Sequence, residues 1–387
     1  MVKSDRLKLA EEALEDGRIE EAMHVLEAIL EEDDDNPDAM VLLGLAYLQS
    51  AQPQRAVSVL TKAEELVEEH CVLCLFLGRA YKALENYDSA EKYLTRALAL
   101  GSDVPEAWAD LAEVHYQRTD YRQAAKLLDE GVGRFPNDSA LHNLRAMVLH
   151  KQGDYTEAAQ EWGVLFHLNP DSLIALTNYA YSSVILGRFE EAAPLVERAI
   201  AMAPNDYRTK MLAAEYYFQS GLYHRAETLF GDALKMSSDS VEALGRLAVI
   251  SKYLGAEKES NKYLERAWSL TCEDCDSWYR LCDALLRLGE HEKMFECLRR
   301  ATEHDPNSAA PWVLLAVELG RRGQRTEAER AWRKSIELRG YIKAHCSICN
   351  TSFKVSLPTA QTASQISCVR CTSCQSEAPI PDSLASI

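Results

Sequence analysis

A repeat of 34 residues is the feature that most constrains how this chain can fold. Counted from Lys3, the same frame fits ten times without an insertion and ends at Ile342. Periods of about 20 to 50 residues are typical of arrays in which each unit buries its apolar face only against its neighbours. The repeat therefore predicts one continuous array in a chain whose 387 residues would otherwise favour two or three globular domains.

Three columns of the frame indicate two helices that pack closely. The eighth position is small in every frame, and the twentieth is small in every frame except the ninth, which has Met294. The twenty-fourth position is bulky and apolar throughout, from Leu26 to Trp332. Small residues let two helices approach each other, and the bulky residue fills the space that they leave. Glycine at the fifteenth position of seven frames marks a turn, and proline at the thirty-second position of four frames ends the second helix.

These residues carry a family resemblance. The segments WADLAEVHYQRTDYRQAAKLLDEGVGRFP (108–136) and LLGLAYLQSAQPQRAVSVLTKA (42–63) resemble tetratricopeptide repeats, and the resemblance extends over residues 3–342. It implies an all-α fold in which ten helix-turn-helix repeats stack into a right-handed superhelix. It also implies a non-enzymatic scaffold or adaptor, because the first helices of this family line a concave groove that binds segments of partner proteins. No phosphate loop, nucleophile elbow or HExxH motif in the sequence points to an enzyme.

The resemblance places the second, fifth, ninth, twelfth and thirteenth positions of each frame in the groove, with the sixth close by. In the middle of the array these positions hold aromatic and amide residues. Such residues suit an extended peptide, because amides bond its backbone and aromatics bury its side chains. The predicted groove residues are Tyr116, Asn143, His150, Asn178, Tyr181, Arg208, Phe218, Arg246, Tyr253 and Tyr279. The alternative interpretation is that some of them pack against a neighbouring helix or face water.

After Gly340 the period stops, and the tail at residues 343–387 alternates apolar and polar residues as short strands do. The tail holds two Cys-x-x-Cys units, of which Cys346 and Cys349 form the first. A cysteine pair in a turn places two thiolates on one side of a metal, and two such pairs complete a tetrahedral site. The arrangement resembles a zinc-ribbon or rubredoxin-like module. The alternatives are a redox dithiol and unpaired surface cysteines.

The second cysteine pair has two interpretations, because Cys368, Cys371 and Cys374 follow at a strict interval of three. We favour Cys371 with Cys374, since the segment ISCVR then leads into the pair and QSEAPI leads out of it, as YIKAH leads into the first pair. Cys371 is a ligand in both schemes, and Cys368 is the alternate ligand. Four thiolates leave no open coordination position, so the site is expected to be structural. Zinc is favoured because it binds this set without redox chemistry, although rubredoxin-type iron uses the same ligands.

Two roles for the tail are open. It caps the exposed end of the tenth repeat, or it docks a second partner. The layout is similar to that of a family of bacterial lipopolysaccharide-assembly adaptors, which carry an N-terminal membrane anchor that is not expected here. A zinc ribbon within a transcription or RNA-associated complex is the other alternative. General nucleic-acid binding is not expected, because the net charge of −18 repels phosphate backbones.

The sequence also predicts a location. The N-terminal segment MVKSDRLKLAEEALEDG has no apolar core of secretory length, and no run of about eighteen apolar residues follows it. The 11 cysteines, several of them in helical segments, fit a reducing cytosol better than a disulfide framework. We therefore expect a cytoplasmic protein with protein or peptide partners. The close pairs Cys71/Cys74 and Cys272/Cys275 are not expected to bind metal.

Overall fold

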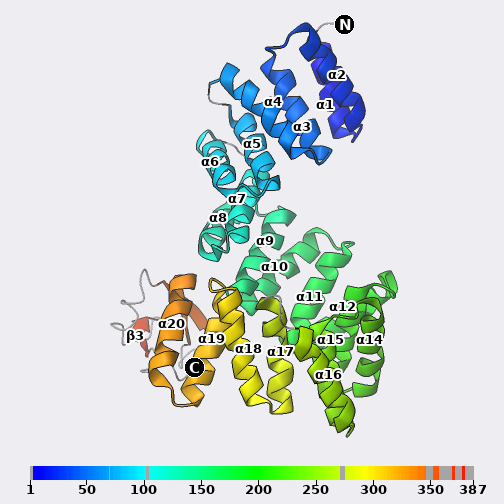
Figure 1. Ribbon diagram of the computed structural model, residues 1–387, viewed down its shortest axis with the longest axis vertical. Helices are drawn as coiled ribbons and strands as arrows, with labels where there is room; N and C mark the ends of the chain where they lie inside the picture. The colour runs from blue at the N-terminus through cyan, green and yellow to red at the C-terminus, as the bar shows by residue number, and fades with distance from the viewer. Residues whose placement is uncertain are drawn as a thin grey trace. The chain divides into compact units, whose positions relative to one another are not determined.

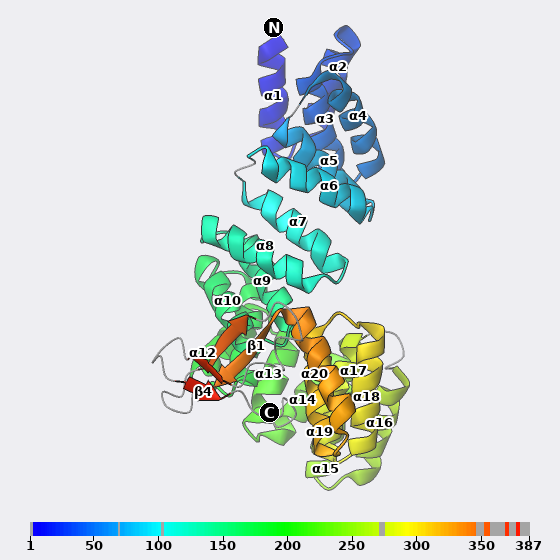
Figure 2. The same cartoon turned by 90° about the vertical axis from the view of Figure 1, so that its left-hand side faces the viewer.

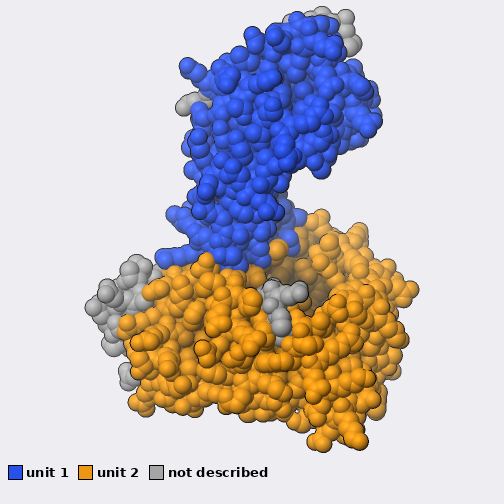
Figure 3. Space-filling model, in the orientation of Figure 1, with its two compact units in different colours: residues 1–144 blue, residues 145–387 orange. Residues whose placement is uncertain are grey.

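The computed structural model describes residues 3–68, 70–101, 104–270, 275–345, 352–356, 368–370 and 377–379. Within these ranges the chain forms twenty helices, followed by four short strands (Figure 1). The chain divides into two compact units, residues 1–144 and residues 145–387 (Figure 3). None of the described helices is long and apolar enough to span a bilayer.

Every predicted frame contains one helix pair. The first helix begins at position 1 of its frame and the second at position 17, in all ten frames. The helices of the first unit are α1 (Lys3–Glu15), α2 (Ile19–Glu32), α3 (Pro37–Gln49), α4 (Pro53–Leu66), α5 (Cys71–Ala83), α6 (Tyr87–Ala99), α7 (Pro105–Gln117) and α8 (Tyr121–Arg134). The boundary between the units falls within α9 (Ser139–Lys151).

The second unit continues the same pattern. Its helices are α10 (Tyr155–Leu168), α11 (Leu173–Ile185), α12 (Phe189–Met202), α13 (Tyr207–Gln219), α14 (Tyr223–Met236), α15 (Val241–Tyr253), α16 (Glu257–Leu270), α17 (Cys275–Leu288), α18 (His291–His304), α19 (Ala309–Arg321) and α20 (Arg325–Arg339). The expectation of an all-α tetratricopeptide-type solenoid is confirmed for the helical part of the chain.

Local signals explain where the helices begin and end. Several first helices start after a capping side chain. At Asn36, for example, the side-chain Oδ1 accepts a hydrogen bond from Ala39 N at 3.0 Å. Position 15 adopts a positive φ in every frame, because the chain must reverse tightly between the two helices. Seven frames use glycine there, whereas Ala51, Glu85 and Thr119 adopt this conformation without it.

The close approach expected between positions 8 and 24 is present. A Cβ placed on Gly44 would lie 2.4 Å from Leu60 Cδ2, and one on Gly78 would lie 2.5 Å from Leu94 Cγ. Leu60 and Leu94 are themselves fully buried. The helices of these two repeats therefore pack at a separation that only glycine allows.

Two short hairpins follow the array. Strand β1 (Tyr341–His345) pairs antiparallel with β2 (Ser352–Ser356), and β3 (Cys368–Arg370) pairs antiparallel with β4 (Glu377–Pro379). Strand β1 begins two residues before the tail boundary that the period indicated. Gly340 has φ +77° and ends α20, so the chain leaves the helix before the tenth frame is complete.

Candidate binding surface

The structure does not bring all ten predicted groove residues into one unit. Tyr116 and Asn143 belong to the first unit, and the other eight belong to the second. Their exposure also differs: His150, Arg208 and Tyr253 are exposed, whereas Phe218 and Arg246 are buried. The remaining five are half-buried. The second unit therefore contains most of the predicted groove residues, and the groove positions of its first helices form what is called its inward face.

Arg246 of α15 joins three successive first helices. Its Nε donates a hydrogen bond to Glu215 Oε2 of α13 at 2.8 Å, and its Nη1 donates to Asp283 Oδ2 of α17. Arg287 Nε lies 3.0 Å from the same Asp283 oxygen. Phe218 of α13 lies beneath two of these charges, because the guanidinium carbons of Arg246 and Arg287 are 5.0 and 5.3 Å from its ring centroid. The inward face of repeats 7–9 is thus cross-linked by charge pairs.

Burial and charge pairing shift the pKa values of this cluster in opposite directions. Burial raises the pKa of Glu215, and the nearby Arg246 guanidinium partly offsets that rise. For Asp283, burial alone would raise the pKa, but Arg246 and Arg287 outweigh it and lower the pKa. For Arg246, the desolvation that lowers the pKa is outweighed by Glu215 and Asp283, which raise it. Arg246 is therefore charged at neutral pH and neutralises a carboxylate that has no access to water.

Tyr181 makes a second connection on the same face. Its hydroxyl donates to Glu242 Oε1 at 2.8 Å, which links α11 to α15 across 61 residues. Burial raises the pKa of Tyr181 well above its ordinary value, so the hydroxyl is protonated and can donate. Arg280 Nη1 lies 3.7 Å from the other oxygen of Glu242. Tyr181 and Arg246 are consequently engaged with their own chain.

The first unit has an equivalent ladder that the sequence analysis missed. Arg79 Nε and Lys82 Nζ lie 2.5 and 2.6 Å from the two oxygens of Asp110, and Lys82 Nζ also contacts Glu113. Arg79 and Asp110 are 31 residues apart, as are Lys82 and Glu113. Glu215 and Arg246 have the same separation. Opposite charges at a spacing of 31 are the sequence signal that could have found these pairs, because that spacing joins adjacent first helices in a 34-residue repeat.

Four apolar side chains on first helices of the second unit are exposed at groove positions. Ile174, Ile185, Tyr253 and Leu286 expose between 44% and 54% of their surface. All four lie on first helices at frame positions assigned to the groove. Met147 and Leu314 share these properties at 37% and 40% exposure. The second unit is visibly hollowed on the face shown in Figure 3. Exposed apolar residues at positions that this repeat presents to the groove are the kind of side chain through which one protein binds another.

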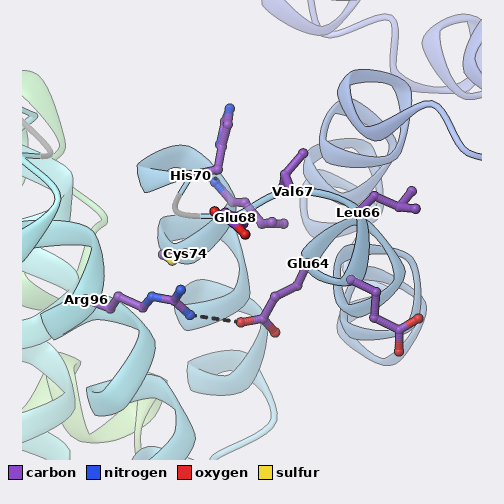
Figure 4. Close-up of a pocket in the computed structure, with 9 residues that line it drawn as sticks. Glu64, Leu66, Val67, Glu68, His70, Cys74 and Arg96 are labelled. Atoms are coloured by element: carbon purple, nitrogen blue, oxygen red, sulfur yellow. Dashed lines mark hydrogen bonds and ion pairs between the residues drawn. The ribbon is translucent and has the colours of Figure 1, made fainter.

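A separate hollow of about 940 Å³ lies in the first unit, between α4, α5 and α6 (Figure 4). Its wall includes Glu64, His70, Cys74 and Arg96. Glu64 accepts hydrogen bonds from Arg96 at 3.2 Å and from the hydroxyl of Tyr93 at 2.8 Å. Glu64 is therefore engaged by its own chain, and the hollow contains none of the predicted groove residues.

The predicted metal ligands lie outside the described residues. Cys346, Cys349, Cys371 and Cys374 fall in the two segments that connect the paired strands, and for Cys368 the backbone is described on β3. Of the other close pairs, Cys71 is half-buried and Cys74 is buried, and neither is in a disulfide. Cys272 lies outside the described residues, as does the side chain of Cys275. Among the side chains that the structure describes, no cluster of His, Cys, Asp and Glu has the geometry of a metal site.

The two segments that connect the paired strands have the same length and the same cysteine spacing. Residues 346–351 join β1 to β2, and residues 371–376 join β3 to β4. Each segment has six residues, with cysteine first and fourth. Cys368 lies instead on strand β3, where it pairs with Pro379.

Comparison with known proteins gives a consistent family. Models of the tetratricopeptide repeat match residues 81–148, 184–245 and 276–319. A model described as anaphase-promoting complex, cyclosome, subunit 3 matches residues 15–97. A crystal structure of a tetratricopeptide repeat protein from Parabacteroides merdae has a TM-score of 0.52 and 14% identity, over 64% of this chain and 97% of that one. This likeness shows the fold.

Curated relatives are similar over part of their length. Human superkiller complex protein 3 is 26% identical over 269 residues, which are 63% of this chain and 17% of that protein. The TPR repeat-containing protein YpiA of Bacillus subtilis is 26% identical over 241 residues, which are 61% of this chain and 55% of that protein. The chain therefore spans less than two thirds of the length of either relative.

Proposed function

Because this chain is a tetratricopeptide repeat protein, we propose that it is a non-enzymatic scaffold whose inward face, on repeats 5–10, binds an extended segment of a partner protein. The observation that carries the proposal is the set of exposed apolar side chains on the first helices of the second unit. Folding normally removes such side chains from water, and six of them remain at positions that this family uses for recognition.

The predicted groove residues then have two different roles. Tyr253 and Arg208 are exposed and are available to contact a partner directly. Phe218 and Arg246 are buried within the charge pairs, so they position the surrounding side chains. Tyr181 has the same supporting role through its bond to Glu242. The partner segment is expected to carry apolar side chains, because Ile174, Ile185 and Leu286 are exposed at groove positions.

A paired substitution tests this proposal. Replacing Tyr253 and Leu286 together with alanine is expected to weaken partner binding by about tenfold or more, because exposed apolar anchors carry most of the energy of such an interface. The matched control replaces Leu222 and Met236, which are exposed by 47% and 50% at frame positions outside the groove. Affinity is measured by calorimetry with a partner isolated from the native host. Equal loss of affinity in both double variants would contradict the assignment of the groove.

For the tail we propose a structural metal module of the zinc-ribbon type, with Cys346, Cys349, Cys371 and Cys374 as ligands and Cys368 as the alternate. The matching six-residue connections support this ligand set, since each of the two strand pairs flanks one Cys-x-x-Cys unit in the sequence. Bound zinc, or iron in the same four thiolates, would supply folding free energy to a segment too short to form a core. Reduced thiolates require a reducing compartment, so a cytoplasmic location belongs to the same proposal.

A further inference from the structure

The turn between α9 and α10 is buried, unlike its counterparts in the other repeats. Position 16 precedes the second helix of every repeat, and Asp154 is the only one of the ten residues at this position that is buried, with an exposed fraction of 0%. Asp120 occupies the same place in repeat 4. It is exposed and caps its own helix by accepting a hydrogen bond from Gln123 N at 3.1 Å. Asp154 makes no such cap, so its carboxylate serves another contact.

Residues far along the chain cover this turn. Ser308, at the start of α19, donates its hydroxyl to Lys151 O at 3.1 Å across 157 residues. The equivalent Ser240 caps its own helix through Ala243 N instead, whereas Ser308 makes no cap bond. Neither Asp154 nor Ser308 caps its own helix, and Ser308 instead makes a contact between repeat 5 and the start of repeat 10.

Two further contacts complete this seam between repeat 5 and repeats 9–10. The hydroxyls of Tyr155 on α10 and Tyr279 on α17 are hydrogen-bonded to each other across 124 residues. Arg339, at the end of α20, lies so close to Gly153 that a Cβ on Gly153 would be 2.7 Å from Arg339 Nη2. Figure 2 shows the upper end of α20 and the adjoining strand β1 next to α9 and α10. Repeats 9 and 10 therefore contact repeat 5, with which the second unit begins.

The tail reaches the same turn. Lys354 Nζ, on strand β2, lies 3.2 Å from Asp154 Oδ2 and 4.0 Å from Glu157 Oε1. The same ammonium lies 4.4 Å from the ring centroid of Tyr341 on β1. Asp154 contributes a side chain with no exposed surface, and a buried carboxylate is tolerated only when a cation accompanies it. Lys354 supplies one such cation from outside the helical array, and Arg339 of α20 interacts electrostatically with the same carboxylate.

We propose that the seam is a clasp that closes repeats 5–10 into a ring, and that the tail holds it shut through Lys354 and Asp154. In an open solenoid each repeat contacts only its neighbours. Here a few side-chain contacts join the two ends of the second unit. Because these contacts are few, they can break and re-form while the repeats themselves stay folded.

Gly153 and Gly221 provide a matched test of the clasp in the full-length chain. Both are turn glycines, with φ of +76° and +77°, so alanine introduces the same backbone strain at either position. A Cβ at Gly153 would lie 2.7 Å from Arg339 Nη2 and 3.4 Å from Ala310 Cα, so it would displace the Arg339 guanidinium from the turn, whereas one at Gly221 would meet nothing within 4 Å. Gly153→Ala is expected to raise amide hydrogen exchange about tenfold or more at residues 151–158, 308–312 and 336–341. Gly221→Ala is expected to leave these three segments unchanged. Equal exchange in the two variants would overturn the clasp.

The contribution of the tail is tested by removing one charge. Lys354→Met is expected to open the same three segments, because it leaves Asp154 buried without its ammonium partner. Lys235→Met is the control, since Lys235 forms only an exposed pair with Asp232 on the same helix. Unchanged exchange at residues 151–158 in Lys354→Met would overturn the role of the tail.

Discussion

Replacing Arg246 with alanine is expected to lower the free energy of unfolding of the second unit by about 3–5 kcal/mol. Glu215 has no exposed side-chain surface, and Arg246 is its charged partner at 2.8 Å. The substitution leaves this carboxylate buried without a cation, and it also removes the guanidinium over the Phe218 ring. The loss is measured from the exchange of buried α15 amides in the full chain, which open only when the unit unfolds.

Arg280→Ala is the matched control for Arg246→Ala. Arg280 is also an arginine on an inward frame position, but its side chain is 57% exposed and lies 3.7 Å from Glu242. Exposed pairs contribute about 0–1 kcal/mol, so little change is expected. Adding Glu215→Gln to Arg246→Ala should restore part of the stability, because it removes the uncompensated charge. A loss below about 1 kcal/mol in Arg246→Ala would show that the cluster does not stabilise the inward face.

Replacing Cys371 and Cys374 together with serine is expected to reduce bound metal from about one ion per chain to none. A tetrahedral thiolate site that loses two of four ligands retains too little binding free energy to hold its metal, since structural zinc contributes about 10–16 kcal/mol through the complete set. The metal content of the purified chain is measured by mass spectrometry, which also distinguishes zinc from iron. Optical absorption of a thiolate–iron site gives an independent reading.

Two controls make this result specific to the pairing. Replacing Cys71 and Cys74 together with serine should leave the metal content unchanged, because these thiols lie within α5 of the first unit. Cys368→Ser should also retain the metal, because Cys368 precedes the six-residue connection. Loss of metal in Cys368→Ser, with retention in Cys374→Ser, would favour the alternate ligand pair.

The helical fold could be predicted almost entirely from the sequence, because each repeat buries its apolar face against the next in the same way. The frame that starts at Lys3 places the first residue of every helix, including those after Met294, which is too large for its column. The tail was harder, since its strands are short. Even so, the spacing of the cysteines matches the positions of β1–β4.

The contacts on the inward face were less predictable, because a frame position indicates the direction of a side chain and not the residues that it contacts. Arg246 occupies a groove position, yet residues from two neighbouring repeats surround it. Comparing charges across frames at a spacing of 31 would have revealed one of these pairs. The seam has no periodic signal at all, because Ser308 and Lys151 are 157 residues apart and meet only when the array has curved back on itself.

Photo-crosslinking from the inward face tests the central claim most directly. A benzophenone amino acid is placed at position 253 or at position 236 of the full chain in its native host, and the adducts are mapped by mass spectrometry. Tyr253 is 45% exposed on a first helix, and Met236 is 50% exposed at the end of a second helix. We predict adducts with one extended partner segment at position 253 and none with that segment at position 236. Adducts with the same segment at both positions, or at position 236 alone, would contradict a scaffold that binds its partner on the inward face.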